Sequence, residues 1–561
     1  MSVFIGYPSF MAYQMMKGKK GNNDDDFPSI SGIIARYSAL GLTNEQMAAN
    51  PVWVDKTGNG HDLQLKNFSW KGMSGVGGYV QDFSYFRNNA TVDKIRIDEQ
   101  GSNFIKVTIL TTGIGNAIYI PKNIYQFNKS YFIKISSEGY DEGDMALSFY
   151  ATSTSTATTV TVSLNSNGVT EIPAIKEDDF LAVYINVSGK VGSFTVEQLP
   201  LYPGALVFDG VDDYGVCDNF PILTKEKGYT VVALRQWITR GEIAQGLVSN
   251  VKNWLKDGAF LLEYRNIQAE HLNKPISFGA IGSEMDLSHI LTYQTSKSYN
   301  GVSITTGNFE GTDVLHVGKL APTNVGTCIN AAIWEFVFLD HDATEEELTK
   351  IKDYFVKTYP WLFPDQAWTV VGKTNEDEDR ATIANITGNG NDLVLSNFGF
   401  AEGSGYNEEG EYAGYLVTDG VDDKIVSSSF EMGKDFTIVG DWKFIDNKKS
   451  GTGLVKGSSF YIYNTMIGLD LYINSGSVKN SLDGIKSINA ACSDGRAYDR
   501  NWNEILANTG NVVGSGGPLE VSSSGGRFDR IAFKNLAIYP RILSKDDCIK
   551  AYNYLQTLKS K

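Results

Sequence analysis

The chain contains 561 residues, and its 49 Lys and Arg residues against 65 Asp and Glu residues give a net charge of −16. At roughly 150 residues per domain, this length suggests about three or four domains. So negative a charge, with no cluster of basic residues to offset it, excludes binding to the phosphate backbone of nucleic acids. With 42% hydrophobic residues, 57 Gly and 12% aromatic residues, the composition excludes a disordered chain or a coiled-coil rod and favours short strands joined by tight turns.

The first 29 residues are predicted to form a docking peptide and a linker. Residues 1–16 carry several large apolar side chains, and Lys17–Asp26 has the Gly, Lys, Asn and Asp composition of a linker. A peptide this short cannot bury such side chains in a core of its own. We therefore expect it to bind a groove or sheet edge of a partner, with a frayed terminus as the alternative. The docking residues are Phe4, Ile5, Tyr7, Phe10, Met11 and Tyr13.

Features of membrane insertion and of secretion are missing from the sequence. No run of about 18 apolar residues occurs, and the N-terminus lacks the basic, apolar and small-residue order of a signal peptide. The cysteines form no CxxC pair and have no metal-like spacing, so we expect free, buried thiols and folding in a reducing cytoplasm. They are Cys217, Cys328, Cys492 and Cys548.

An internal repeat organises the rest of the chain. TGNGHDLQLKNF at 57–68 returns as TGNGNDLVLSNF at 387–398, an offset of 330 residues. Downstream, LVFDGVDDYGV from Leu206 returns as LVTDGVDDKIV from Leu416, where the offset has fallen to 210 residues. The first copy therefore holds about 120 residues that the second copy lacks.

The additional residues lie between about Tyr85 and Leu201, and we expect them to form a separate small β-sandwich. They contain six short segments rich in β-branched and aromatic residues, at the near-regular spacing typical of a sandwich. An exposed loop tip of the host tolerates such an insertion. The segments are KIRI at 94, FIKVTIL at 104, YFIKI at 131, TTVTVSL at 158, LAVYINV at 181 and SFTVEQL at 193.

Each copy is predicted to close with a strand and a short capped helix. Thr344 has the position of an N-cap, and Glu347 completes a capping box. Ser544 and Asp547 form a weaker version in the second copy. Apolar residues then recur on one helical face, at Leu348, Ile351 and Phe355 in the first copy and at Cys548, Tyr552 and Leu555 in the second.

The pattern WxDxTGNGHDLxLxNFxW, the later LVFDGVDDYGV and the closing strand and helix resemble the laminin-G-like, concanavalin-A-like jelly-roll superfamily. The resemblance covers both copies, about 400 of the 561 residues. The N-terminal organisation also resembles that of structural proteins of tailed bacteriophages of gut bacteria, where such modules occur in head fibres and tail fibres. This second resemblance implies a virion component.

These observations together predict an all-β chain of two tandem jelly-roll sandwiches, with a small β-sandwich inserted in the first and a short helix closing each repeat. The expected division is a docking peptide and linker at 1–29, a discontinuous first jelly roll at 30–85 and 202–363, the inserted domain at 86–201, and a second jelly roll at 364–561.

No catalytic constellation stands out, so we expect the protein not to be an enzyme. Glycoside hydrolases of the resembled fold carry carboxylates alternating along one strand, in a pattern like ExDxE, and no such strand is present. The acidic run Glu376–Asp379 has no counterpart in the first copy, which favours a solvated loop. The histidines lie in no nucleophile or zinc motif, and His61 becomes Asn391 in the second copy, which suits a turn residue.

One acidic cluster is present in both copies. The resemblance implies that calcium, a hard cation bound by carboxylates and carbonyls, is a candidate ligand for it. The alternative, which we favour, is an Asp-Gly turn whose other aspartates cap it or face solvent. No other cofactor is expected. The residues are Asp209, Asp212 and Asp213, matched by Asp419, Asp422 and Asp423.

Sugar binding requires an exposed aromatic platform flanked by amide and carboxylate groups. Trp53, Trp70 and Trp334 lie in apolar, strand-like surroundings and are expected in the core. Trp254 and Trp502 lie in more polar segments and are the better surface candidates.

The expected role is a non-enzymatic virion protein, a head or tail fibre or a capsid decoration, that presents lectin-like domains for attachment to a host or to glycans. Its N-terminus would bind other virion proteins, and weak contacts with glycans would add up by multivalency. Such a protein is made in the host cytoplasm and located in the virion. The alternative is a secreted or cell-surface carbohydrate-active enzyme with two glycan-binding modules. A spacer without a ligand and a homo-oligomer both remain open.

Overall fold

A computed structural model describes residues 26–560 of the protein, apart from short internal stretches. The docking residues Phe4, Ile5, Tyr7, Phe10, Met11 and Tyr13 lie outside the described residues, and so does Trp254. The internal stretches that are not described are 90–92, 113–115, 139–144, 154–158, 165–167, 178–179, 225, 240–244, 254–260, 266–289, 304–309, 320–327, 411, 446–451, 457–459, 465–467, 474–479, 484–487, 507–514, 522 and 525–526.

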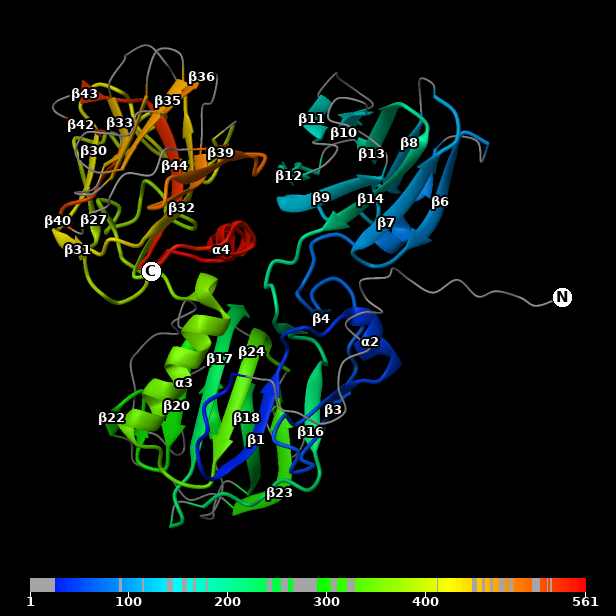
Figure 1. Cartoon of the computed structure of the whole chain (residues 1–561), viewed down its shortest axis with the longest axis vertical. Coiled ribbons are helices and arrows are strands. Elements are labelled where there is room, and N and C mark those ends of the chain that lie inside the picture. Colours follow the sequence, from blue (N-terminus) through cyan, green and yellow to red (C-terminus); the bar gives the residue numbers. More distant parts are fainter. Residues whose placement is uncertain are drawn as a thin grey trace.

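The protein is an all-β chain, which confirms the predicted class, and its strands form three groups of sheets (Figure 1). Only short helices interrupt the strands in the described part of the chain. None of these helices is long and apolar enough to cross a membrane. The helices are α2 (Asn44–Ala49), α3 (Glu345–Thr358) and α4 (Lys545–Gln556), with 3-10 turns η1 (Phe83–Tyr85) and η3 (Pro360–Leu362).

The first repeat folds into an eight-stranded and a six-stranded antiparallel sheet. The larger sheet has the order β22-β21-β20-β17-β24-β15-β4, and β1 also pairs with β24; the smaller has the order β19-β18-β23-β16-β3-β2. The strands of the larger sheet are β1 (Ile33–Ser38), β4 (Gly75–Val76), β15 (Leu206–Asp209), β17 (Thr230–Thr239), β20 (Leu291–Thr295), β21 (Ser298–Tyr299), β22 (Val302–Ser303) and β24 (Asn330–Leu339). Those of the smaller sheet are β2 (Val52–Trp53), β3 (Leu63–Lys66), β16 (Tyr214–Cys217), β18 (Gln245–Asn253), β19 (Leu261–Arg265) and β23 (Glu310–Val317).

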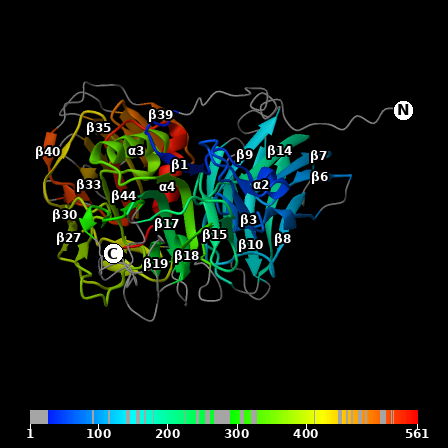
Figure 2. The same cartoon turned by 90° about the horizontal axis from the view of Figure 1, so that it is seen from below.

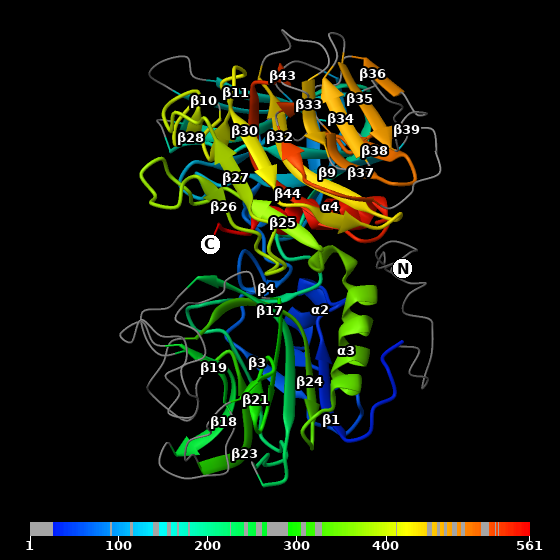
Figure 3. The same ribbon diagram turned by 90° about the vertical axis from the view of Figure 1, so that its left-hand side faces the viewer.

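Strand β24 is buried on both faces, and a bulge at Trp334 shifts the alternation of its side chains by one residue. Ile333 and Phe336 pack into the core between the two sheets. Trp334 and Val337 pack on the other face, in a cluster that includes Phe355 of α3. Figure 3 shows α3 lying alongside β24 and β1.

The second repeat contains two eight-stranded sheets and two small two-stranded ones. The first sheet has the order β28-β29-β44-β32-β37-β38-β39, with β25 also on β44, and the second has the order β26-β27-β30-β41-β33-β34-β35-β36. The strands of the first are β25 (Gln366–Thr369), β28 (Gly405–Asn407), β29 (Tyr415–Val417), β32 (Thr437–Phe444), β37 (Ile488–Cys492), β38 (Arg496–Asp499), β39 (Glu504–Leu506) and β44 (Ile531–Tyr539). Those of the second are β26 (Thr382–Ile383), β27 (Leu393–Ser396), β30 (Lys424–Ser427), β33 (Thr452–Lys456), β34 (Phe460–Asn464), β35 (Gly468–Ile473), β36 (Asn480–Asp483) and β41 (Glu520–Val521). The small sheets pair β31 (Phe430–Met432) with β40 (Ser515–Gly517) and β42 (Ser523–Ser524) with β43 (Arg527–Phe528).

The repeated sequence blocks adopt the same local structure, as the sequence predicts. Strand β3 in TGNGHDLQLKNF corresponds to β27 in TGNGNDLVLSNF, and both strands show the same buried and exposed alternation. The closing helices are also confirmed. Thr344 and Glu347 form the capping box of α3, and the Ser544 side chain accepts a hydrogen bond from the Asp547 amide at the start of α4.

The additional residues of the first copy form two five-stranded sheets with their own core. Their orders are β11-β10-β13-β8-β5 and β12-β9-β14-β7-β6. The strands are β5 (Arg87–Asn88), β6 (Ile95–Gln100), β7 (Phe104–Ile109), β8 (Ala117–Pro121), β9 (Tyr131–Glu138), β10 (Met145–Ser153), β11 (Thr159–Leu164), β12 (Gly168–Ile172), β13 (Phe180–Gly189) and β14 (Gly192–Gln198). Each of the six predicted segments overlaps one of these strands. We call this unit the inserted lobe.

The inserted lobe leaves and re-enters the first repeat at adjacent points. The Leu201 amide donates to the Gly78 carbonyl at 2.9 Å, and the Tyr202 amide donates to the Gly77 carbonyl at 2.8 Å. Val80 already packs in the core of the lobe. We therefore propose a boundary near Gly78, a few residues earlier than the expected one at 85/86.

Helix α4 lies where the three groups of sheets meet, and Figures 1 and 2 show the inserted lobe and the second repeat side by side at this place. The Tyr552 ring of α4 meets the Phe132 ring of the inserted lobe edge to face, with the ring centres 5.3 Å apart. Arg500 of the second repeat forms an ion pair with Glu171 of the lobe at 3.4 Å. Gln236 of the first repeat donates to the Thr557 hydroxyl at 3.2 Å. The three units therefore share one continuous buried cluster around α4.

Candidate functional site

The TGNG segment forms a turn that is held from inside by one side chain. In the first copy, Asp55 Oδ1 accepts hydrogen bonds from the Arg36 amide and from the amide and hydroxyl of Thr57. Asn385 Oδ1 accepts the matching bonds in the second copy, from the amide of Ala367 and both groups of Thr387. These bonds place the third residue of the motif at the rim of each turn. This third residue is Asn59 in the first copy, where its side-chain amide donates to the Ile34 carbonyl. In the second copy it is Asn389, whose side-chain amide donates to the Asp365 carbonyl.

The DGVDD segment forms a corner with the same hydrogen bonds in both copies. The buried Asp213 accepts from the Asp209 amide at 3.1 Å and from the Ser74 hydroxyl at 3.1 Å. Asp209 Oδ1 accepts from the Val211 amide at 2.8 Å. In the second copy, Asp423 accepts from the amide of Asp419 and from Ser404, and Asp419 accepts from the amide of Val421. The corner therefore ties the end of β15 to the loop before β4, and the end of β29 to the loop before β28.

The predicted calcium candidates do lie together, since the ligand oxygens of each aspartate trio are within 4.8 Å of one another. Burial, together with the charge of Asp209, raises the pKa of Asp213 to about 7, and burial raises the pKa of Asp423 to about 6. Both oxygens of Asp213 already accept a hydrogen bond, which leaves each oxygen one lone pair for a cation. The donors present fit the turn interpretation, and calcium stays an untested candidate.

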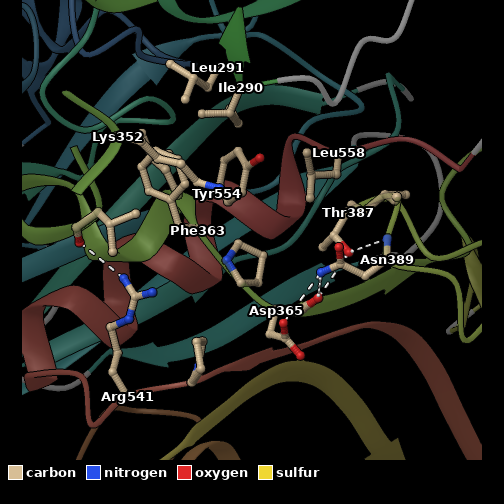
Figure 4. A pocket seen from close by; sticks show the side chains of 16 residues that line it. Ile290, Leu291, Lys352, Phe363, Asp365, Thr387, Asn389, Arg541, Tyr554 and Leu558 are labelled. Carbon is tan, nitrogen blue, oxygen red and sulfur yellow. Dashed lines mark hydrogen bonds between the residues drawn. The ribbon is translucent and has the colours of Figure 1, made fainter. Parts of the chain in front are cut away.

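A pocket of about 530 Å³ opens between the two repeats (Figure 4). This volume lies within the range of small-molecule sites. The first repeat contributes the start of β20 and the last turns of α3, and the second repeat contributes its TGNG turn, the loop before α4 and the end of α4. The lining residues are Ile290, Leu291, Lys352, Val356, Leu362, Phe363, Pro364, Asp365, Ile386, Thr387, Gly388, Asn389, Pro540, Arg541, Tyr554 and Leu558. We call this cavity the inter-repeat pocket.

The two walls of the inter-repeat pocket differ: one combines the apolar Phe363 with the cationic Arg541, and the other is formed by uncharged polar groups and Asp365. In Figure 4, Phe363 and Arg541 lie to the left, while Asp365, Thr387 and Asn389 lie to the right. The polar wall is fixed by hydrogen bonds, because the Thr387 hydroxyl and the Asn389 amide both donate to the Asp365 carbonyl, at 3.0 and 2.7 Å. On the other side, Arg541 Nη1 donates to the carbonyl of Val356 at 3.1 Å.

Two smaller pockets lie near the corners of the repeats. One of about 510 Å³ is acidic. Glu402, Glu408 and Glu409 come from the loops on either side of β28, and Glu376 comes from the loop between β25 and β26. The other, of about 350 Å³, lies where the inserted lobe joins the first repeat and is lined by Lys71, Lys129, Tyr79 and Tyr85 among others. Lys71 forms an ion pair with Asp82 there.

The tryptophan predictions hold in part. Trp53 and Trp334 are buried as expected, and Trp70 is half-buried. The prediction of Trp502 as a surface residue is wrong, because only 1% of it is exposed. Its ring packs against Tyr498 of the same sheet and against Tyr552 of α4.

The cysteine prediction is confirmed, since all four thiols are free and buried. The inter-repeat pocket itself was not found from the sequence. Its only sequence signal is that Arg541 replaces His341 of the first copy in the loop before the closing helix.

No family profile matches the sequence, and no curated protein matches it either. Solved structures that align with the chain include a Trypanosoma rangeli sialidase in complex with sialic acid, with 9% identity, a TM-score of 0.26, and 87% of this chain and 97% of that chain covered. The tandem CBM22 domains of Paenibacillus barcinonensis Xyn10C align with 8% identity, a TM-score of 0.16, and 49% and 99% coverage. The binding domain of botulinum neurotoxin DC in complex with rat synaptotagmin II aligns with 10% identity, a TM-score of 0.21, and 61% and 86% coverage. At TM-scores this low, the alignments carry no argument about what this chain binds or catalyses.

Proposed function

We propose that the protein is a non-enzymatic structural component of a bacteriophage particle, a fibre or capsid decoration, whose β-sandwiches bind glycans. The inter-repeat pocket is the observation that carries the glycan-binding part. A pyranose ring offers an apolar face of C–H groups and a rim of hydroxyls. The wall with Phe363 suits the face. The side-chain oxygen of Asn389 and the carboxylate of Asp365 suit the rim, since both can accept hydrogen bonds from sugar hydroxyls.

Binding of bacterial surface oligosaccharides to the full chain tests this proposal, with Asn389→Ala as the site variant. Asn59→Ala is a matched control, because Asn59 makes the same turn contact in the first repeat but does not line the inter-repeat pocket. Both substitutions remove one amide from equivalent turns, so we expect similar losses of thermal stability. Only Asn389→Ala should weaken binding. Equal binding by both variants, or no binding by the unmodified chain to any glycan of the panel, would refute the proposed site.

The location in a virion rests on the composition of the N-terminus. Phe4, Ile5 and Tyr7 belong to a short apolar peptide followed by a linker, which suits burial in a partner while the folded part stands away from the anchor. A chain without residues 1–16 should keep the melting temperature of the full chain and fail to enter particles. Normal incorporation of the shortened chain would contradict the anchor.

A carbohydrate-active enzyme, at the cell surface or secreted, is the second candidate, and one observation favours it. The acidic pocket gathers Glu376, Glu402, Glu408 and Glu409, and glycoside hydrolysis uses a pair of carboxyl groups. A reducing-end assay on bacterial polysaccharides decides between the two. We expect no turnover, whereas turnover that Glu402→Gln abolishes would establish the enzyme.

A further inference from the structure

Arg541 and His341 occupy equivalent positions in the two repeats. In the first, the Thr230 hydroxyl donates to the His341 carbonyl at 2.8 Å and accepts from the Ala343 amide. In the second, the Thr437 hydroxyl donates to the Arg541 carbonyl at 2.9 Å and accepts from the Leu543 amide. The backbone of the loop before the closing helix is therefore held in the same way, and the two side chains can be compared directly.

The ring of His341 has acidic neighbours at both of its nitrogens. Its ring nitrogens lie 3.1 Å from an Asp340 oxygen and 3.2 Å from a Glu347 oxygen. These carboxylates raise the pKa of His341 by hydrogen bonding and by their charge.

The second repeat lacks this arrangement at Arg541. Pro540 stands where the first repeat has Asp340. Asp547, the counterpart of Glu347, accepts instead from the hydroxyl of Ser544 at 2.7 Å and from Lys550 at 3.1 Å. Within the described residues, no carboxylate forms an ion pair with Arg541, and burial lowers the pKa of its guanidinium.

The guanidinium therefore sits at the wall of the inter-repeat pocket with most of its donors unused. It has five N–H groups, and the single side-chain hydrogen bond described for it goes to the Val356 carbonyl. Lys352 lines the same pocket, and it too has no ion pair among the described residues. A partly desolvated cation without a counter-charge is unfavourable, and an anion in the pocket would relieve this cost.

We propose that the inter-repeat pocket is selective for a carboxylated sugar, a hexuronate residue of an acidic glycan, with its carboxylate on Arg541. This inference rests on the proposed glycan-binding function. The planar fork of the guanidinium matches a carboxylate in a bidentate manner, and Lys352 adds a second positive charge at the rim. The Asp365 carboxylate, which would repel an anion, lies on the opposite wall (Figure 4) and accepts from the Gln366 side-chain amide at 3.0 Å. The sugar would thus be oriented with its carboxylate toward Arg541 and its hydroxyls toward Asn389.

The test is calorimetric titration of the full chain with an oligogalacturonate and with its methyl ester, which keeps the shape and removes the charge. One charge-assisted hydrogen bond corresponds to a preference for the acid of about tenfold or more. This preference should weaken as salt is raised. Arg541→Gln should bring the affinity for the acid down to that of the ester, and Arg541→Lys should keep only part of the preference because the fork is lost. A galactose phosphate serves as a further probe, and tighter binding of it than of galacturonate would refute a site built for a carboxylate.

Lys352→Ala and Lys350→Ala form a matched pair on α3. Lys350 is exposed and paired with Glu346 on the same helix, so its removal should leave the preference unchanged, while removal of Lys352 should reduce it. Arg541 also donates a hydrogen bond to the Val356 carbonyl at the C-terminal end of α3, where a cation stabilises the helix. If that were its whole role, Arg541→Gln would lower the melting temperature and leave the ratio of acid to ester affinity as it was, which would overturn the proposal. Equal affinities for acid and ester would also overturn it and leave glycan binding intact, whereas no binding of either, or of any neutral sugar, would refute the proposed function itself.

Discussion

Docking of the inserted lobe onto the second repeat can be measured through one pair of aromatic rings. On β9, Tyr131 and Ile133 point into the core of the lobe, and Phe132 between them points the other way, toward α4. Phe132 is 6% exposed and Tyr552 is 1% exposed. Their rings are nearly perpendicular, at 88°, which is a favourable arrangement for two aromatic rings.

We expect Phe132→Ala and Tyr552→Ala each to lower the free energy of unfolding by about 3–5 kcal/mol, the usual loss for a buried aromatic residue. Because the two rings touch, the double variant should lose less than the sum of the single losses. The coupling should be about 0.5–1.5 kcal/mol. Tyr552 also meets the Trp502 ring at 5.6 Å, and that contact is lost in both variants that lack Tyr552, so it cancels from the cycle.

Urea unfolding of the unmodified chain, the two single variants and the double variant gives the coupling free energy of the two rings. Hydrogen exchange of the β9 amides shows whether the lobe separates before the rest unfolds. Phe149, which is buried in the opposite sheet of the lobe, provides the control. The losses in the free energy of unfolding caused by Phe149→Ala and by Tyr552→Ala should add up in the double variant. If the Phe132 and Tyr552 losses also add within about 0.3 kcal/mol, the two rings do not interact in solution and the lobe is not docked as described.

Two further predictions concern the DGVDD corner. The raised pKa of Asp213, about 7, means that the folded chain takes up a proton on this group as the pH falls below 7, while the unfolded chain does so only near its ordinary value of 3.8. The charged carboxylate therefore costs stability above pH 7. This cost decreases steadily as the pH falls below 7 and is lost completely only below the ordinary value of 3.8. The melting temperature of Asp213→Asn relative to the unmodified chain should thus increase from pH 5 to pH 8, and a difference that is independent of pH would contradict the raised pKa. Millimolar calcium should leave the melting temperature of the unmodified chain unchanged, since the Asp213 carboxylate is buried and already serves as the acceptor that holds the corner together. A rise that Asp213→Asn and Asp423→Asn together abolish would instead establish a calcium site.

Those features that depend on neighbouring residues in the chain could be predicted from the sequence. The capping box of Thr344 and Glu347 forms within one helical turn, and the strands of the inserted lobe follow from local β-branched runs. The two aspartate trios are likewise brought together by a single short segment. In each of these cases the interacting groups are only a few residues apart, so local patterns suffice.

The rest depends on contacts between distant parts of the chain. Trp502 is flanked by Asn residues, and nothing nearby indicates that Tyr552 of α4 covers its ring. The inter-repeat pocket combines Lys352, Asn389 and Arg541, which lie in three separate segments. The lack of a counter-charge at Arg541 becomes evident only when its surroundings are compared with those of His341 in the other repeat.

The close spacing of the two points at which the inserted lobe joins its host has a consequence for how this gene can change. Val76 of β4 pairs with Leu206 of β15 on either side of the lobe, and Tyr406 of β28 pairs with Leu416 of β29 in a repeat that carries no lobe. A recombination event that replaced the segment between Gly78 and Leu201 by a short loop would restore the simpler hairpin, and any other domain with adjacent termini could be spliced in at the same place. The host sandwich would keep its own core through such exchanges, because Ile333 and Phe336 pack between its two sheets rather than against the lobe. The first repeat can thus accept a different domain at this place without loss of its own core. We expect related genes to differ most in the segment that corresponds to Gly78–Leu201.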